Sequence, residues 1–172
     1  PTDWQLLREC RVPLMIVAEE KWRKTPNVLA AIDLETDVVQ KQQLNQQVLA
    51  QAKQLATNQQ AETFVLYTVP YSPLLRDLGL QFTDELESNA QHTLRGEVSA
   101  LAAQYDIPIE NFIIKVGLPE KVIPSTAAHH KAGVVVMGTV GRKGVTAKLM
   151  GNTAEKVLKL LKSDVVALQP QP

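Results

Sequence analysis

The stretch VVVMGTVGRKGVTAKLMGNTAEKVLKLLKSDVVAL, residues 134–168, decides the fold. It begins with Val134–Met137, an apolar run that predicts a buried strand. A glycine-rich connection follows, and residues 152–162 then carry apolar side chains at helical spacing. The segment ends on a second apolar run, Val165–Leu168. A strand, a helix and a strand in this order predict a parallel, right-handed crossover.

The same alternation extends toward the N-terminus. Three more strands are expected at Asn27–Asp33, Thr63–Val69 and Asn111–Val116, separated by helical patterns. The first of these helices has an apolar stripe of Leu44, Val48, Ala52, Leu55 and Ala56. We therefore expect an α/β fold with a Rossmann-like, doubly wound, five-stranded parallel sheet of strand order 3-2-1-4-5.

Local signals predict where the other helices begin and end. Thr83 is the expected N-cap of a helix whose apolar stripe reaches Ala102. The segment Pro70–Gln81 is predicted to be a long loop, because it holds two prolines and a glycine. A further helix should begin at Pro119 and end at Ala132-Gly133.

The first 18 residues predict the end of another unit. A helix at Asp3–Arg8 and a strand at Val12–Val17 repeat the arrangement at the C-terminus. We expect residues 1–18 to be the last helix and strand of a preceding domain, 19–26 a linker, and 27–169 the main domain. The alternative is that the first segment simply packs on a single domain. Val165–Leu168 should be an edge strand that pairs with Leu14–Val17, within one chain or between two copies.

Composition excludes several classes of protein. The 172 residues have a formal net charge of zero, which argues against a general nucleic-acid binder. Charged residues interrupt every apolar run before it reaches the roughly 18 residues of a membrane helix, and Asp3, Arg8, Glu9 and Arg11 lead us to expect no signal peptide. The single cysteine, Cys10, cannot form an internal disulfide. A cytoplasmic location is expected.

The glycines after residue 137 predict an anion site. Gly138 and Gly141 follow the apolar strand, and Gly151, Asn152 and Thr153 open the last helix. Backbone amides without an obstructing Cβ and a helix N-terminus together make a phosphate cradle. The alternative is a plain connection with Asn152 as the N-cap. The spacing fits neither a P-loop nor a G-x-G-x-x-G dinucleotide site.

Other polar residues have two interpretations each. Asp33 ends the first strand beside the expected switch point, where it either binds a ribose or base or caps the next turn. Arg142 and Lys143 either screen phosphate charge or form a solvated loop face. His129 and His130 are adjacent on a helix and rarely chelate one ion, so no metal site is expected. No nucleophile and base are paired for covalent catalysis, so we expect no enzyme beyond slow ATP hydrolysis.

The quoted segment, with Asp33 at the first strand end and Gly-x2-Gly-x9-Gly before the last helix, resembles the universal stress protein family over residues 27–169. The likeness is greatest to the second half of its tandem-domain members. It implies a fold like that of the adenine nucleotide alpha hydrolases, domain pairing through the last strands, and ATP with Mg²⁺ as the ligand. Asp33 would contact the nucleoside, and Met137, Gly138, Gly141, Arg142, Gly151, Asn152 and Thr153 would surround the ribose and phosphates. Asn152 stands where the ATP-binding pattern has Ser or Thr.

Three functions are therefore expected candidates. The first is a stress-response sensor that binds ATP or a related nucleotide and shifts domain pairing. The second is a protein-interaction module without a nucleotide. The third is a carrier or enzyme for another, apolar ligand that enters past the Pro70–Gln81 loop.

Overall fold

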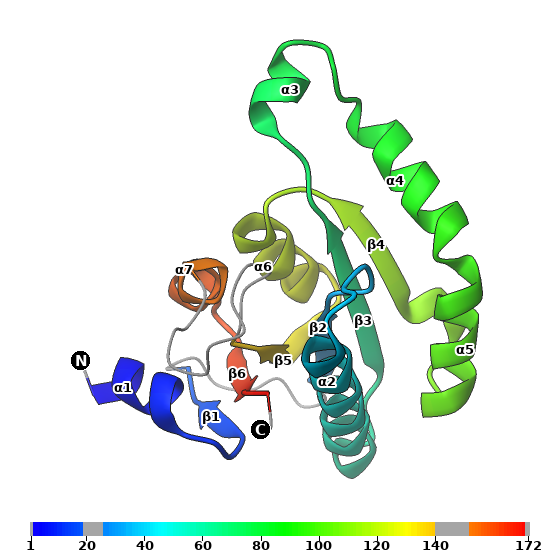
Figure 1. Cartoon of the computed structure of the whole chain (residues 1–172). Helices are drawn as coiled ribbons and strands as arrows, with labels where there is room; N and C mark the ends of the chain where they lie inside the picture. Colours follow the sequence, from blue (N-terminus) through cyan, green and yellow to red (C-terminus); the bar gives the residue numbers. More distant parts are fainter. Residues whose placement is uncertain (1, 19–25, 140–151, 171–172) are drawn as a thin grey trace.

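A computed structural model describes residues 2–18, 26–139 and 152–170. Its centre is a six-stranded sheet of order β1-β6-β5-β2-β3-β4 (Figure 1). Five of the strands are parallel: β2 (Asn27–Ile32), β3 (Thr63–Val69), β4 (Phe112–Val116), β5 (Ala132–Gly138) and β6 (Asp164–Leu168). Read in chain order, these five strands lie 3-2-1-4-5, which confirms the expected topology.

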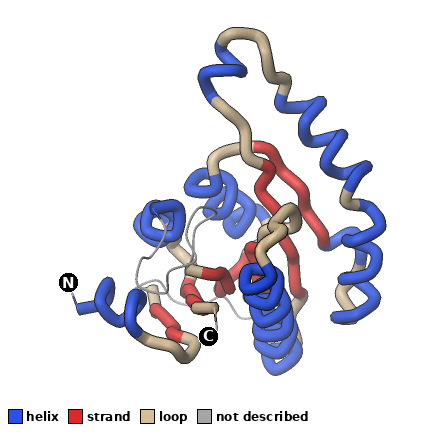
Figure 2. Tube along the Cα trace, viewed as in Figure 1, coloured by secondary structure: helices blue, strands red, loops and turns tan. Residues whose placement is uncertain are grey.

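Helices cover both faces of the sheet, as Figure 2 shows. The packed clusters place α2 (Val39–Gln59), α4 (Thr83–Thr93) and α5 (Arg95–Tyr105) on one face. The opposite cluster holds α6 (Pro119–His129), α7 (Asn152–Leu160) and Leu7 of α1 (Thr2–Glu9). Successive residues of β5 alternate between the two clusters, since Val134 and Val136 belong to the first and Val135 and Met137 to the second. The sheet is thus the middle of three layers, as its apolar strands predict.

The sixth strand is β1 (Leu14–Ile16), which pairs antiparallel with β6. Met15 lies opposite Val166, so the expected pairing of these two segments occurs within one chain. The prediction that Val165–Leu168 is an edge strand is wrong for this chain, because β1 covers that edge and every residue of β6 is buried. The division into a remnant, a linker and a domain stays a prediction.

Several predicted boundaries are wrong, and each has a local cause. Thr83 is not an N-cap: Phe82 takes that position without a side-chain cap bond, and the helix already begins at Thr83. The helical pattern reaching Ala102 is two helices that meet at Leu94, just before Gly96, a residue that weakens helices. The predicted loop at Pro70–Gln81 contains a short helix, α3 (Pro73–Asp77), capped by the Ser72 side chain.

Ala132 and Gly133 do not terminate α6 but belong to β5. The turn after the helix is made by Lys131, which adopts a left-handed backbone with φ 55°. Gly133 is the extra residue of a bulge, because Asn27 lies opposite Ala132 and Val28 opposite Val134. A Cβ at Gly133 would lie 2.2 Å from the Cβ of Pro26, so only glycine fits against that ring. A short 3₁₀ turn, η1 (Ile109–Asn111), precedes β4.

Acidification is expected to destabilise the protein through His130, whose ring lies 4.3 Å from that of Phe64. Burial lowers the pKa of His130, His129 lowers it further, and Glu62 raises it in part. The folded-state pKa therefore lies below the unfolded value of about 6.5. The neutral ring of His130 therefore makes its full contribution to the free energy of unfolding above the unfolded pKa. That contribution is lost as the pH falls through the folded-state pKa.

Urea unfolding midpoints measured from about pH 7.5 to 5 test this expectation. His130→Phe keeps an aromatic ring against Phe64 and should flatten this part of the pH dependence. An unchanged pH dependence in the variant would assign the effect to other groups.

Candidate nucleotide site at the carboxyl edge of the sheet

The site is built where the strand order reverses. Strands β2 and β5 are parallel neighbours, and Ala31 lies opposite Met137. Asp33 follows β2 directly, so it stands beside the end of β5 at Gly138. The helices that follow these two strands lie on opposite faces of the sheet, the arrangement at which doubly wound folds generally bind ligands. The predicted pairing of the strands that precede Asp33 and Gly138 is confirmed.

The main chain of Asp33 is held from both sides by one amide side chain. The Asp33 N–H donates to Asn45 Oδ1 at 3.1 Å, and Asn45 Nδ2 donates to the Asp33 carbonyl at 2.6 Å. The buried Tyr67 of β3 donates its hydroxyl proton to the Glu35 carboxylate and so ties down the same loop. Sequence reasoning missed Asn45, although its polar side chain beside a buried helical stripe was a usable signal.

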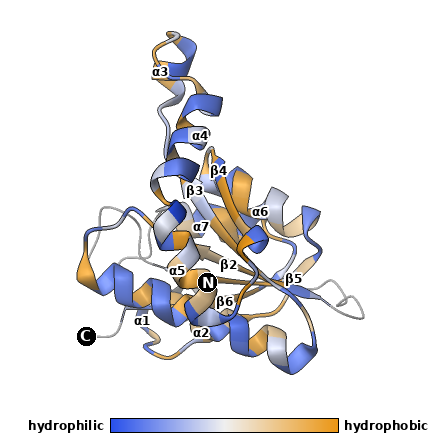
Figure 3. Cartoon of the chain, turned by 90° about the vertical axis from the view of Figure 1, so that its right-hand side faces the viewer, coloured by the Kyte–Doolittle hydropathy of each residue, from blue (hydrophilic) through white to orange (hydrophobic). Residues whose placement is uncertain are grey.

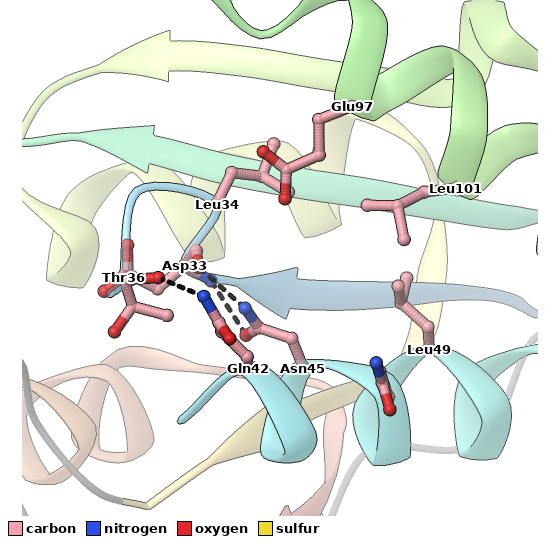
Figure 4. A pocket seen from close by; sticks show the side chains of 9 residues that line it. Asp33, Leu34, Thr36, Gln42, Asn45, Leu49, Glu97 and Leu101 are labelled. Atoms are coloured by element: carbon pink, nitrogen blue, oxygen red, sulfur yellow. Dashed lines mark hydrogen bonds between the residues drawn. The ribbon is translucent and has the colours of Figure 1, made fainter. Parts of the chain in front are cut away.

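Asp33 also lines a cavity of about 180 Å³ between α2 and α5 (Figure 4). Leu34, Leu49 and Leu101 form its apolar walls. Its polar lining consists of Asp33, Thr36, Gln42, Asn45, Gln46 and Glu97. Burial raises the pKa of Glu97, so its carboxyl group gains a proton more readily than an ordinary glutamate. Such a cavity suits a small group that is partly apolar and hydrogen-bonds at its edges.

Gly138 packs against the hydrophobic core and not against open space that a ligand could fill. A Cβ at this position would lie 2.5 Å from Cδ2 of Leu44, a buried side chain of α2. The absence of a side chain at Gly138 therefore has a packing reason that is independent of any ligand. Met137 is likewise buried, at 6% exposure, in the cluster beneath α6 and α7, so only its backbone is available to a ligand.

The remaining predicted residues divide between the start of α7 and the undescribed connection. Thr153 is exposed in the first turn of α7. Gly141, Arg142, Lys143 and Gly151 lie outside the described residues, and Asn152 is described only as the first residue of α7. The structure thus brings together Asp33, Met137 and Gly138, and the glycine loop itself stays a prediction.

Comparison with known proteins agrees with this architecture. The family model described as "Universal stress protein family" matches residues 26–169. Universal stress protein E of Salmonella typhi is 33% identical over 175 residues, which cover 99% of this chain and 55% of that protein. The chain therefore spans about half the length of the curated relatives it matches.

Solved structures give the same result. A putative universal stress protein from Pseudomonas aeruginosa superposes with a TM-score of 0.76 at 31% identity, covering 99% of this chain and 56% of the other. A universal stress protein in complex with cAMP superposes with a TM-score of 0.50 at 18% identity, covering 85% and 98% of the two chains, and supports the fold alone. The chain belongs to the universal stress protein family.

Proposed function

We propose that this universal stress protein binds an adenine nucleotide, ATP or a related one, at the carboxyl edge of its sheet. The observation that carries the proposal is the placement of Asp33 beside Gly138, at the point where the strand order reverses. A carboxylate there can accept hydrogen bonds from ribose hydroxyls, and the N-terminus of α7 follows β5 to meet an anion. A nucleotide complex known for one relative, with cAMP, is in keeping with this ligand class.

The proposed role is that of a stress-response sensor. Nucleotide binding, with Mg²⁺ when the ligand is ATP, would change how this domain pairs with a preceding one, whose proposed last strand is β1 on β6. The proposal is one of binding and not of catalysis, because Asp33 is assigned to the sugar and not to a water. No helix in the described part of the chain is both long and apolar enough to span a membrane. We also propose that the protein acts in the cytoplasm.

Thermal unfolding with added ATP tests the proposal. A ligand that binds only the native state stabilises it by about 2.7 kcal/mol at a concentration 100-fold above Kd. That gain raises Tm by roughly 5–10 °C in a domain of this size. The Asp33→Ala substitution removes the carboxylate but leaves both hydrogen bonds to Asn45, which use the Asp33 main chain. It should therefore remove most of the ATP shift while the hydrogen bonds that hold the Asp33 main chain remain.

Asp37→Ala is the matched control, since Asp37 is an exposed acid of the same β2–α2 segment. The control should keep the full ATP shift. No rise in Tm at millimolar ATP in the wild type would contradict nucleotide binding.

A protein-interaction role is the second candidate. The observation that favours it is the projecting arm around α3, which carries Leu74, Leu78, Leu80 and Phe82 at 58–68% exposure. Figures 1 and 3 show this arm extending away from the body, with apolar and polar residues interleaved. Exposed apolar groups in this number are typical of a contact surface. Absence of any ATP effect would favour this candidate.

A further inference from the structure

Lys41 is a buried lysine at the candidate site. The residue is only 7% exposed, although lysine is rarely buried to this degree in proteins. It lies in the first turn of α2, the helix that follows Asp33. A cation in the first turn opposes the helix dipole, so helix stability does not explain the choice of lysine there.

The position of Lys41 on α2 places it next to both strand ends of the site. Lys41, Leu44 and Val48 share the buried face of the helix, at the spacing that puts side chains one above the other. Leu44 packs against Gly138 of β5, and Asn45, four residues after Lys41, holds the main chain of Asp33. Lys41 precedes both by one helical turn and therefore lies at the carboxyl edge of the sheet.

The charges around Lys41 favour a cation at this position. Residues 33–45 contain three acids, Asp33, Glu35 and Asp37, and Lys41 is their only basic residue. Three carboxylates would repel a phosphate, and a partly desolvated ammonium offsets that repulsion more strongly than an exposed one. An ammonium has three donors, so one lysine can bond to the protein and to a phosphate at the same time.

We propose that Lys41 binds the phosphates of the nucleotide, as the cationic counterpart of Asp33 at the sugar. This inference rests on the proposed function and assigns phosphate recognition to α2 as well as to α7. It requires that the contribution of Lys41 to the binding free energy increase with the negative charge of the ligand. A lysine that only supports packing would affect charged and uncharged ligands alike.

Calorimetric titration of the full chain with ATP and with adenosine separates these roles. In Lys41→Met the ATP affinity should fall about ten- to a hundred-fold, the usual cost of losing a charge-assisted hydrogen bond. Adenosine affinity should stay within about twofold, because adenosine lacks the phosphates. Lys41→Arg, which keeps the positive charge, should retain most of the ATP affinity.

Lys53→Met is the matched control. It removes one lysine charge from the same helix, 12 residues or about 18 Å further along, where Lys53 Nζ lies 3.5 Å from Oδ2 of Asp106. It should change neither affinity. If Lys41→Met does not fold, Lys41→Gln provides the same comparison with a polar neutral side chain.

Two results would overturn the inference while leaving the proposed function intact. One is wild-type ATP affinity in Lys41→Met, and the other is an equal loss for ATP and adenosine. A wild-type protein that binds neither ligand would instead overturn the proposed function, and the inference with it.

Discussion

Replacing Gly138 with valine is expected to lower the free energy of unfolding by about 1–3 kcal/mol, even without any nucleotide. The cause is a steric conflict in the core. The new Cβ would lie 2.5 Å from Cδ2 and 3.2 Å from Cγ of Leu44, which is itself only 5% exposed. Interiors are packed as densely as organic crystals, so Leu44 has little room to move aside.

A double variant identifies the cause. Leu44→Ala alone leaves a cavity and should cost about 2–5 kcal/mol. In Gly138→Val combined with Leu44→Ala, the valine fills part of that space, so the loss should be smaller than the sum of the single losses. Urea unfolding gives the four free energies. Strictly additive losses would show that Gly138 and Leu44 do not interact.

This prediction changes how the glycine should be used in binding studies. A Gly138 variant that fails to bind ATP is ambiguous, because its core is disturbed as well. Asp33→Ala and Lys41→Met are better probes, since neither adds volume to the packed layer between α2 and β5.

Removing residues 1–18 is expected to have the second large effect, since it uncovers the edge of β6. The deletion takes away the β1 ladder and Leu7, which is 3% exposed. It also removes the Ala18 N–H that donates to the buried Asp164 carboxylate at 2.6 Å. Burial of one leucine and a hydrogen bond to a carboxylate together contribute about 3–6 kcal/mol.

The shortened chain should also associate, because an apolar strand with unpaired backbone groups is a template for pairing with another copy. Light scattering across a range of concentrations should show a rise in mass for this variant alone. A chain that lacks only residues 1–13 keeps β1 and is the control for loss of α1. A monomeric deletion variant with an unchanged unfolding midpoint would contradict the expectation.

The sequence predicts the strands and their order well because each strand is a short, mostly apolar run. Thr63–Val69 is both the predicted and the observed strand, and Pro119 begins its helix as expected. The place of Asp33 beside the end of β5 follows from that order alone. These features depend on local pattern and on general rules of topology, which one sequence contains.

The contacts that shape the site were not predictable in this way. Asn45 bonds to Asp33 across 12 residues, and Glu97 lines the same cavity from another helix. Leu44 and Gly138 meet from elements almost a hundred residues apart. Such contacts depend on how α2 sits over β5, which periodicity does not specify. The predicted edge position of β6 failed for a related reason, because the pairing with β1 is also long-range.

The bulge at the start of β5 has a consequence at the other end of the strand. Gly133 has no partner in the pairing of β5 with β2, so every later residue of β5 is shifted by one residue in register relative to β2. In a strand a one-residue step exchanges the two faces. Without it, Val135 and Met137 would turn toward α2, and Gly138 would no longer face Leu44. Gly133 thus determines which face of the sheet each later residue of β5 occupies, and hence which backbone groups lie beside Asp33. It does so from about 16 Å away, the length of strand between Gly133 and Gly138.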